Sequence, residues 1–322
     1  MKAAVLEGIK NLKIKNVPDI KNVPDGYVKI EIKSVGICGS DIHYYEYGRI
    51  GDFVVNKPMI LGHETAGIIE NPGNSKKFKK GDIVAIEPGI PCGHCEYCKR
   101  GDYNLCNYIK FHATPPVDGS MQKFIVYPED FVYRAYPLTT EEACLAEPMS
   151  VGVFAVKRSG MRFGKRALVI GSGSVGIMTA IAIESTGSEP VLCDIDNNKI
   201  NIAKSLKYMA FKNDEINDEY DYVFECSGYG SEFALKHTSR GGILVLIGMG
   251  NENIDALVAI TKGITIKGIF RYANIYGISL ELIKKNRKKL KIFQSNIIPM
   301  NDLPAFLRYK KYNKFFKTIV EL

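Results

Sequence analysis

Short apolar runs broken by glycine and proline dominate the first half of the chain. Their alternation of apolar and polar residues predicts β-strands joined by turns. Few segments in this half have the apolar spacing that is typical of an amphipathic helix. The predicted strands lie within residues 27–38, 64–70, 81–89 and 123–136. The pattern therefore predicts a β-rich N-terminal region.

The pattern changes after Glu147, where helical spacing begins to alternate with continuous apolar runs. Residues 150–160 have the spacing of a helix. A predicted strand, a glycine-rich turn and a predicted helix follow in residues 165–187. Further apolar runs, typical of buried strands, lie within residues 189–196, 220–228 and 241–248. Strands that alternate with helices predict a parallel sheet.

Together these patterns predict an α/β protein of two domains. From about residue 275 the chain becomes helical and rich in lysine, and residues 316–322 predict a final strand. We expect a β-rich domain of residues 1–149, to which residues 275–322 return. Residues 150–274 are expected to form an inserted domain with a doubly wound parallel sheet. A chain of 322 residues is long enough for this plan.

Composition narrows the class of protein. Hydrophobic residues make up 46% of the chain and charged residues 24%, as in ordinary water-soluble globular proteins. No apolar run has the length of a transmembrane helix, and charge interrupts the first residues too early for a signal peptide. We therefore expect a cytoplasmic protein with reduced thiols and no membrane partner.

The net charge of +8 is concentrated in two lysine-rich tracts, residues 283–293 and 308–317. Such tracts can bind nucleic acid or an anionic substrate. A solvated helix face is the simpler interpretation, because no nucleic-acid-binding motif accompanies the charge. The sequence therefore predicts no nucleic-acid partner.

Half of the eight cysteines lie in one short segment with the spacing C-x2-C-x2-C-x7-C. They are Cys92, Cys95, Cys98 and Cys106. Zinc prefers tetrahedral sulfur ligands, and four protein ligands leave no position for a substrate. The segment therefore predicts a structural zinc site, with a redox centre or an iron–sulfur cluster as alternatives. We interpret His94, inside the segment, as an exposed residue rather than a ligand.

Other residues of the types that bind metals lie outside that segment: Cys38, Ser40, Asp41, His43, His63, Glu64 and Glu147. Each has an ordinary explanation when it is considered alone. A single cysteine is usually a small buried apolar group, and Glu147 before a proline is able to stabilise a helix start. Their spacing along the chain does not by itself identify a metal site.

A glycine-rich turn, G-x-G-x-x-G, lies between a predicted strand and a predicted helix at Gly171, Gly173 and Gly176. This context favours a dinucleotide-binding site over an ordinary turn. The first glycine allows a tight turn, the second allows the pyrophosphate to approach, and the third allows close packing of helix and strand. The start of the helix supplies N–H groups for phosphate.

Asp194 follows this motif at the end of the next predicted strand, 18 residues beyond Gly176. A carboxylate there accepts hydrogen bonds from ribose hydroxyls and repels a 2′-phosphate, so we predict NAD rather than NADP. Asp196 strengthens this repulsion if it faces the same way, whereas an ordinary turn aspartate is the alternative for Asp194. The predicted cofactor-binding residues are Gly171, Gly173, Val175, Gly176, Asp194 and Lys199.

Taken together, these motifs resemble those of the zinc-dependent medium-chain alcohol dehydrogenases, and within them the sorbitol and polyol dehydrogenases. The resemblance covers nearly the whole chain. The matching segments are residues 36–69, 81–89, 92–106, 111–124, 145–153, 169–177, 224–228 and 268–274. It implies a GroES-like β-rich catalytic domain and a Rossmann NAD-binding domain.

The resemblance also implies a catalytic zinc in addition to the structural one. Its ligands would be Cys38 and His63, with Glu64 as an additional ligand in the polyol branch. Glu147 would reach the metal directly or through bound water. Three protein ligands with one open position is the arrangement that catalysis needs.

The implied substrate contacts are Tyr44, Phe111, Glu147, Arg271 and Tyr272. A surface salt bridge is the alternative role for Arg271, and a place in the core is the alternative for Tyr272. The substrate proton would leave either through Ser40 and His43 or through Glu147. The expected reaction is hydride transfer between NAD and a secondary hydroxyl of a small polyol, which gives a ketose.

One departure from the family concerns residues 205–222, which look abbreviated, so we predict a dinucleotide domain trimmed at its outer edge. The implied assembly is a homo-oligomer, a tetramer or a dimer. Two alternatives remain open: a related dehydrogenase of threonine, galactitol, a sugar or a sugar phosphate, and a zinc-stabilised binding protein without catalysis.

Overall fold

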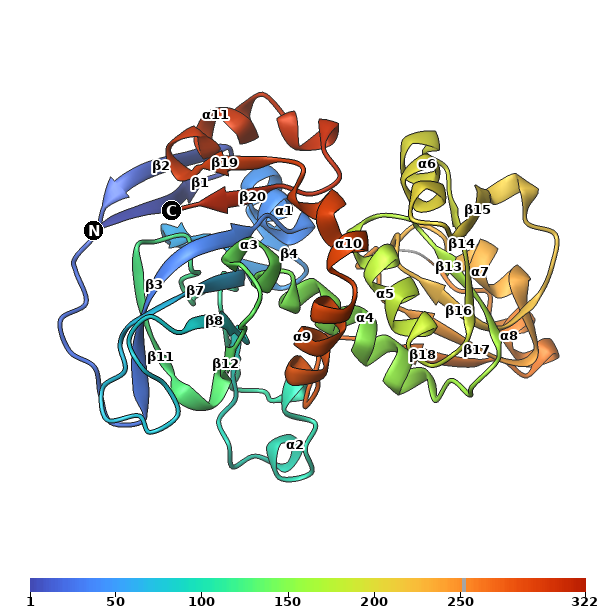
Figure 1. Ribbon diagram of the computed structural model, residues 1–322. Coiled ribbons are helices and arrows are strands. Elements are labelled where there is room, and N and C mark those ends of the chain that lie inside the picture. The colour runs from blue at the N-terminus through green and yellow to red at the C-terminus, as the bar shows by residue number, and fades with distance from the viewer. Residues whose placement is uncertain (251–252) are drawn as a thin grey trace. The chain divides into compact units, whose positions relative to one another are not determined.

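The computed structural model describes residues 1–250 and 253–322 (Figure 1). Contacts within the chain divide it into two compact units. The first unit comprises Met1–Glu147 and Ile283–Leu322, and the second unit comprises Pro148–Leu282. Helix α4 (Ala146–Ser159) and helix α9 (Tyr276–Lys285) each run across a boundary between these ranges.

The first unit is built on an antiparallel sheet whose long central strands are β3 (Tyr27–Gly36) and β7 (Glu64–Asn71). The strand order is β12-β8-β7-β3-β20-β19, and β11 also pairs with β3. The C-terminal strand β20 (Ile319–Glu321) lies beside β3 from the N-terminal part of the chain (Figure 1). The remaining strands of this sheet are β8 (Ile83–Ile86), β11 (Phe124–Pro128), β12 (Val132–Arg134) and β19 (Ile297–Pro299).

Smaller elements surround this sheet. Strands in the order β2-β1-β6 form a second sheet. Strand β4 pairs with β5, and β9 pairs with β10. These strands are β1 (Lys2–Gly8), β2 (Asn11–Asn16), β4 (Arg49–Ile50), β5 (Phe53–Val54), β6 (Met59–Ile60), β9 (Gly89–Ile90) and β10 (Lys110–Phe111). The helices are α1 (Gly39–Tyr47), α2 (Glu96–Lys99), α3 (Thr140–Ala143), α10 (Arg287–Leu290) and α11 (Leu303–Arg308). Short 3-10 helices lie at Tyr103–Leu105, Glu129–Phe131, Lys291–Gln294, Met300–Asp302 and Lys311–Lys314.

The second unit is a parallel sheet with the strand order β15-β14-β13-β16-β17-β18. The strands are β13 (Arg166–Ile170), β14 (Glu189–Asp194), β15 (Met209–Lys212), β16 (Tyr220–Glu225), β17 (Thr238–Leu246) and β18 (Thr265–Gly268). The connecting helices are α5 (Ser174–Glu184), α6 (Asn197–Ser205), α7 (Ser231–His237) and α8 (Ala256–Lys262). The predicted α/β fold with a doubly wound sheet is confirmed.

Continuous apolar strands create the core of the second unit. Leu168, Val191, Val223 and Leu244 come from four neighbouring strands and are almost completely buried. The direction of winding reverses between β13 and β16, so the carboxyl ends of these two strands form the topological switch point at which doubly wound sheets bind ligands.

The predicted trimming of the outer edge takes a specific form. The edge strand β15 is present and pairs with β14. The connection from β15 to β16 contains only a short 3-10 helix, Asn213–Glu215. Met209 and Phe211 on β15 are partly exposed, as expected for an edge strand with little cover. In the described residues, no helix is both long enough and apolar enough to cross a membrane.

Candidate functional site

The pairing of β3 with β7 brings the first group of predicted metal ligands together. Gly36 at the end of β3 pairs with Glu64 at the start of β7. Cys38 follows β3 as the residue that precedes helix α1, and His63 immediately precedes β7. The ligand atoms of Cys38, His63 and Glu64 consequently lie within 4.8 Å of one another.

Asp41 fixes the backbone on both sides of this group. Its carboxylate accepts hydrogen bonds from the backbone N–H of Cys38 and of Gly62, each at 3.0 Å. Its Oδ1 also lies 3.9 Å from Nδ1 of His63. Burial raises the pKa of Asp41, although His63 and the two N–H donors oppose the shift. The sequence analysis named Asp41 only as a residue of a type that binds metals, whereas its position in the first turn of a helix signals a capping residue.

Lys317, which the sequence analysis did not single out, forms a buried ion pair with Glu64. Its Nζ donates to Glu64 Oε1 at 2.6 Å and to the carbonyl of Ile37 at 3.0 Å. Glu64 Oε2 lies 2.5 Å from the same Nζ, yet among the described residues it accepts no hydrogen bond of its own. A Cβ at Gly36 would lie 2.0 Å from this oxygen, so only glycine leaves room for it.

The electrostatics of this group suit a cation. Burial by itself would lower the pKa of His63, but the field of Cys38 and Asp41 outweighs burial and raises it well above its usual value. Glu147, buried at the start of α4, contributes in the same direction. Sulfur, imidazole and carboxylate donors at this distance fit a zinc ion.

The four clustered cysteines form a second group in the first unit. Their sulfur atoms lie within 4.8 Å of one another, and all eight cysteines of the chain are free thiols. Cys92 Sγ accepts a hydrogen bond from the backbone N–H of Cys95 at 3.4 Å. Backbone hydrogen bonds from His94 and Cys95 lower the pKa of Cys92 to about 6. Four sulfurs with N–H support fit a structural zinc. The imidazole of His94 is exposed and contacts the carbonyl of Cys92.

The residues predicted for substrate and proton transfer occupy different environments. The rings of Phe111 and His63 lie 5.9 Å apart, which places Phe111 beside the first group of ligands. Ser40, His43 and Tyr44 lie on α1, where Tyr44 is buried. His43 is exposed, and its Nδ1 contacts the carbonyl of Arg49 at 2.7 Å.

Arg271 and Tyr272 belong to the second unit, so their substrate roles remain predictions. The guanidinium of Arg271 lies over the ring of Phe270, 4.7 Å from its centre. Tyr272 is buried, with its ring 6.0 Å from that of Tyr276. The positive φ of 55° at Arg271 is unusual for a residue other than glycine.

The glycine turn follows β13 and opens helix α5. Gly171 has a φ of 90°, a conformation that favours glycine. A Cβ at Gly176 would lie 1.9 Å from the carbonyl oxygen of Gly171, so this residue must be glycine for helix and turn to pack. A Cβ at Gly173 would meet no atom within 4 Å among the described residues. The turn thus leaves open space at Gly173, the position where a pyrophosphate is expected.

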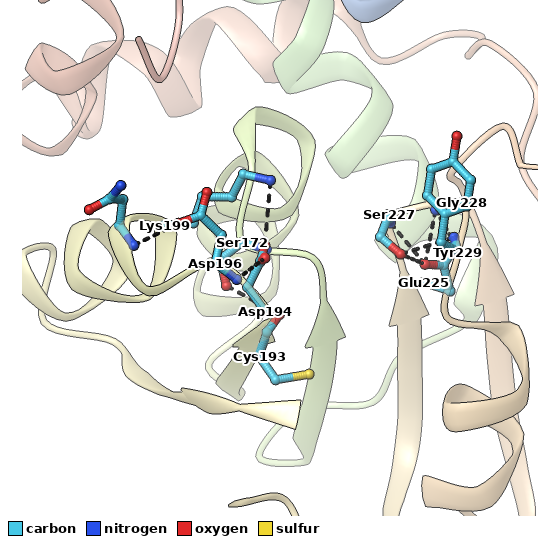
Figure 2. A network of polar contacts seen from close by, with 10 residues as sticks. Ser172, Cys193, Asp194, Asp196, Lys199, Glu225, Ser227, Gly228 and Tyr229 are labelled. Carbon is cyan, nitrogen blue, oxygen red and sulfur yellow. Dashed lines mark hydrogen bonds and ion pairs between the residues drawn. The ribbon is translucent and has the colours of Figure 1, made fainter. Parts of the chain in front are cut away.

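Asp194, at the carboxyl end of β14, is tied to the same turn (Figure 2). Its Oδ2 accepts a hydrogen bond from the N–H of Ser172 at 2.7 Å, and its Oδ1 accepts one from Asp196 at 2.9 Å. Lys199 Nζ lies 3.9 Å from Oδ2. Asp196 caps helix α6 by accepting the N–H of Asn198. The carboxylate of Asp194 is therefore fixed next to the glycine turn.

Comparison with known proteins gives matches over nearly the whole chain. The family model described as the alcohol dehydrogenase GroES-like domain matches residues 24–137. Sorbitol dehydrogenase from Bacillus subtilis is 40% identical, over 88% of this chain and 86% of its own. D-xylulose reductase A from Aspergillus niger is 35% identical, over 98% of this chain and 95% of its own.

Solved structures give the same picture. The chain is similar to an oxidoreductase of unknown specificity from Escherichia coli, with a TM-score of 0.92 and 31% identity. This match covers 99% of the present chain and 98% of the other. The resemblance deduced from the motifs is confirmed by these comparisons.

Proposed function

The chain belongs to the zinc-dependent medium-chain alcohol dehydrogenases, in their sorbitol dehydrogenase branch, and we propose that it oxidises a polyol with NAD. The reaction would convert a secondary hydroxyl flanked by other hydroxyls into a ketone. The observation that carries the proposal is the convergence of Cys38, His63 and Glu64, whose ligand atoms lie within 4.8 Å. These residues would hold the catalytic zinc.

When bound, zinc would supply Lewis acidity to the substrate hydroxyl and NAD would supply the hydride acceptor. Asp41 would keep Cys38 and His63 in place through the hydrogen bonds it accepts from the backbone N–H of Cys38 and of Gly62, which precedes His63. Phe111 beside His63 would exclude water from one side of the substrate. Tyr44, Arg271 and Tyr272 are the further candidates for contacts with the polyol.

Two routes are available for the substrate proton. Ser40 and His43 share helix α1, and the exposed imidazole of His43 offers a path to solvent. Glu147 is instead buried, and its charge acts on His63. We favour Glu147 as the acceptor, because the carboxylate belongs to the same electrostatic group as the metal ligands.

We further propose that NAD, rather than NADP, binds along the glycine turn. The fixed carboxylate of Asp194 would accept the adenosine ribose hydroxyls and repel a 2′-phosphate. Lys199 would assist at the same ribose. The N–H groups at the start of α5, near Gly173 and Val175, would bind the pyrophosphate.

Three finer proposals concern the whole protein. Cys92, Cys95, Cys98 and Cys106 would hold a second, structural zinc. The working form would be a homo-oligomer, a tetramer or a dimer, and the protein would act in the cytoplasm. Sedimentation analysis of the zinc-loaded protein tests the assembly, since a monomer at micromolar concentration would contradict it.

The decisive experiment follows NADH formation by the purified protein with sorbitol, xylitol, galactitol and threonine. We expect turnover with the polyols, and loss of that turnover in Cys38→Ser. A matched control is Cys144→Ser, which alters a buried thiol of the same unit that belongs to neither group of metal ligands. Retained activity in Cys38→Ser, or turnover of threonine alone, would overturn the proposed function.

A further inference from the structure

A second buried carboxylate, Glu225, ends strand β16 beside the glycine turn (Figure 2). Its side chain is part of a residue only 1% exposed. Oε1 accepts hydrogen bonds from the N–H of Ser227 at 2.9 Å and of Gly228 at 3.0 Å. Oε2 accepts from the same N–H of Gly228 at 2.9 Å, and the hydroxyl of Ser227 donates to Oε1.

These contacts make the carboxylate the organising centre of a tight turn. A buried charge is costly unless hydrogen bonds replace its hydration. The hydrogen-bond donors found for Glu225 in the described part of the chain belong to the turn directly after it. Ser227 Oγ in turn accepts the N–H of Tyr229 at 3.1 Å. The anion therefore fixes the conformation of residues 226–229, as charge-assisted hydrogen bonds do.

The turn lies against the glycine turn at the topological switch point. Glu225 pairs with Ile170, and the N–H of Cys226 donates to the carbonyl of Ile170 at 2.8 Å. A Cβ at Gly171 would lie 3.0 Å from the nitrogen of Ser227. The two turns that follow β13 and β16 are therefore in contact, and the position of one constrains the other.

The segment that follows β17 packs against the same turn. The carbonyl of Glu225 accepts the N–H of Ile247 at 2.9 Å and of Gly248 at 3.0 Å. A Cβ at Gly248 would lie 2.0 Å from the nitrogen of Gly228, so the two backbones touch. One residue thus connects, through its side chain and its backbone, the ends of β16 and β17.

We propose that Glu225 is a positioning residue for the nicotinamide half of the dinucleotide, an inference that rests on the proposed function. Asp194 ends the strand on one side of β13 and would take the adenosine ribose. Glu225 ends the strand on the other side. A dinucleotide bound across the switch point has its second half over β16. The turn at residues 226–229, held by Glu225, borders that half through its backbone.

The test compares two ligands with the purified, zinc-loaded protein. NADH contains both halves of the dinucleotide, whereas AMP contains only the adenosine half. In Glu225→Gln one acceptor oxygen is replaced by an NH2 donor, which faces the N–H of Gly228 if the remaining oxygen keeps the place of Oε1, and the loss of charge weakens the other bonds, so the turn should loosen. We expect the Kd for NADH, measured by fluorescence, to rise about tenfold and the Kd for AMP to change less than about twofold.

The matched control is Glu219→Gln, immediately before the amino end of the same strand. Glu219 is exposed and pairs with Lys262, so both affinities should stay as in the unaltered protein. In turnover assays, Glu225→Gln should raise the KM for NAD while kcat at saturating NAD is largely retained. Substitution of a residue that merely supports the fold would weaken the binding of NADH and AMP alike. It would not raise the KM for NAD while kcat is retained.

Each result decides between the inferences. Equal NADH affinity of Glu225→Gln and the unaltered protein overturns the positioning role alone, and so does an equal loss for NADH and AMP. Failure of the unaltered protein to bind NADH overturns the proposed function, and the positioning role with it. If Glu225→Gln does not fold, Ser227→Ala removes one donor to the carboxylate and must give the same selective loss of NADH affinity.

Discussion

At the scale of single residues, Lys317 and Glu64 form the buried ion pair beside the proposed catalytic zinc site. Burial would lower the pKa of Lys317, but the field of Glu64 outweighs it and raises the pKa. A buried pair contributes little relative to an apolar pair, but removal of one partner leaves an uncompensated charge. The pair therefore limits which substitutions the site tolerates.

We predict that Lys317→Met destabilises the protein. The variant should lose about 3–5 kcal/mol of its free energy of unfolding, because the carboxylate of Glu64 remains buried without its cation. Chemical denaturation of the metal-free protein measures the loss. The double variant Lys317→Met with Glu64→Gln should recover a large part of it. Losses that simply add in the double variant would show that the two charges do not interact.

A different buried carboxylate, that of Glu87, should make the stability of the protein depend on pH. The hydroxyls of Tyr103 and Tyr133 donate to it at 2.7 and 2.8 Å, yet burial dominates and raises its pKa. The folded protein therefore holds the proton of Glu87 more tightly than the unfolded chain does. The stability that results is present below the ordinary carboxyl pKa and is lost as the pH rises through the folded-state pKa.

In Glu87→Gln the side chain at position 87 carries no charge at any pH, so the variant does not lose this part of its stability as the pH rises. Its free energy of unfolding relative to the unaltered protein should therefore increase as the pH rises from the ordinary carboxyl pKa of about 4.3 through the raised folded-state pKa of Glu87. Denaturation curves at a series of pH values measure this difference. Glu70→Gln, at a partly exposed position on β7, is the control for loss of a carboxylate. A difference that is constant with pH would contradict the assignment.

The sequence identified many residues of the candidate site, for a physical reason. Phosphate-binding glycines follow a local spacing rule, so Gly171 is recognisable in the chain itself. Cys38 and His63 were predicted only through the family resemblance of the motifs around them, because their spacing alone does not identify a metal site. Lys317 was missed, because its partner Glu64 lies 253 positions away and a lysine just before a short apolar strand has no local signal. Glu225 was missed because its role depends on the turn after it and on contacts with two other strands.

At the scale of secondary-structure elements, two glycines have different roles. Gly176 on α5 is needed for packing against the glycine turn, whereas Gly173 borders the space expected for a ligand. In Gly176→Ala the new methyl group would lie 1.9 Å from the carbonyl oxygen of Gly171, so the helix must move. Overpacking of this kind costs about 1–3 kcal/mol. Gly173→Ala, one turn earlier, has free space and a φ of −74° that alanine adopts readily.

We therefore expect opposite behaviour from the two variants. Gly176→Ala should unfold at a temperature about 3–8 °C lower than the unaltered protein. Gly173→Ala should keep its unfolding temperature but bind NADH about tenfold more weakly, because the methyl group occupies the space for the pyrophosphate. Thermal unfolding and a fluorescence titration of each variant measure both quantities. Unaltered NADH affinity in Gly173→Ala would argue against a pyrophosphate at this turn.

Several of the longer strands and helices followed the apolar pattern, because they are long enough to show its period. The predicted strands within residues 27–38 and 64–70 became β3 and β7, and the predicted final strand became β20. The connection after β15 was harder to predict. A short 3-10 helix such as Asn213–Glu215 has too few residues to show a period, so the sequence indicated only that this connection is short.

At the scale of the whole molecule, the two proposed zinc sites should have separable roles. The cysteine group that contains Cys98 shapes the segment between Cys92 and Cys106, which includes Tyr103, and Tyr103 donates its hydroxyl to the buried Glu87. Loss of this metal would release the segment and its link to the core of the first unit. Structural zinc contributes to folding directly, whereas an open catalytic site contributes mainly to chemistry.

Two cysteine variants should therefore fail in different ways. Cys98→Ser should lose about one of two zinc ions per chain and unfold at a temperature roughly 5–10 °C lower. Cys38→Ser should also lose about one zinc, but it should keep its unfolding temperature to within a few degrees while turnover disappears. Elemental analysis, thermal unfolding and NADH formation on the same samples measure all three quantities. A site built only for catalysis leaves the surrounding sheet intact when it is empty. Equal losses of stability in both variants would therefore mean that the metal bound by Cys38 supports the fold as much as the chemistry.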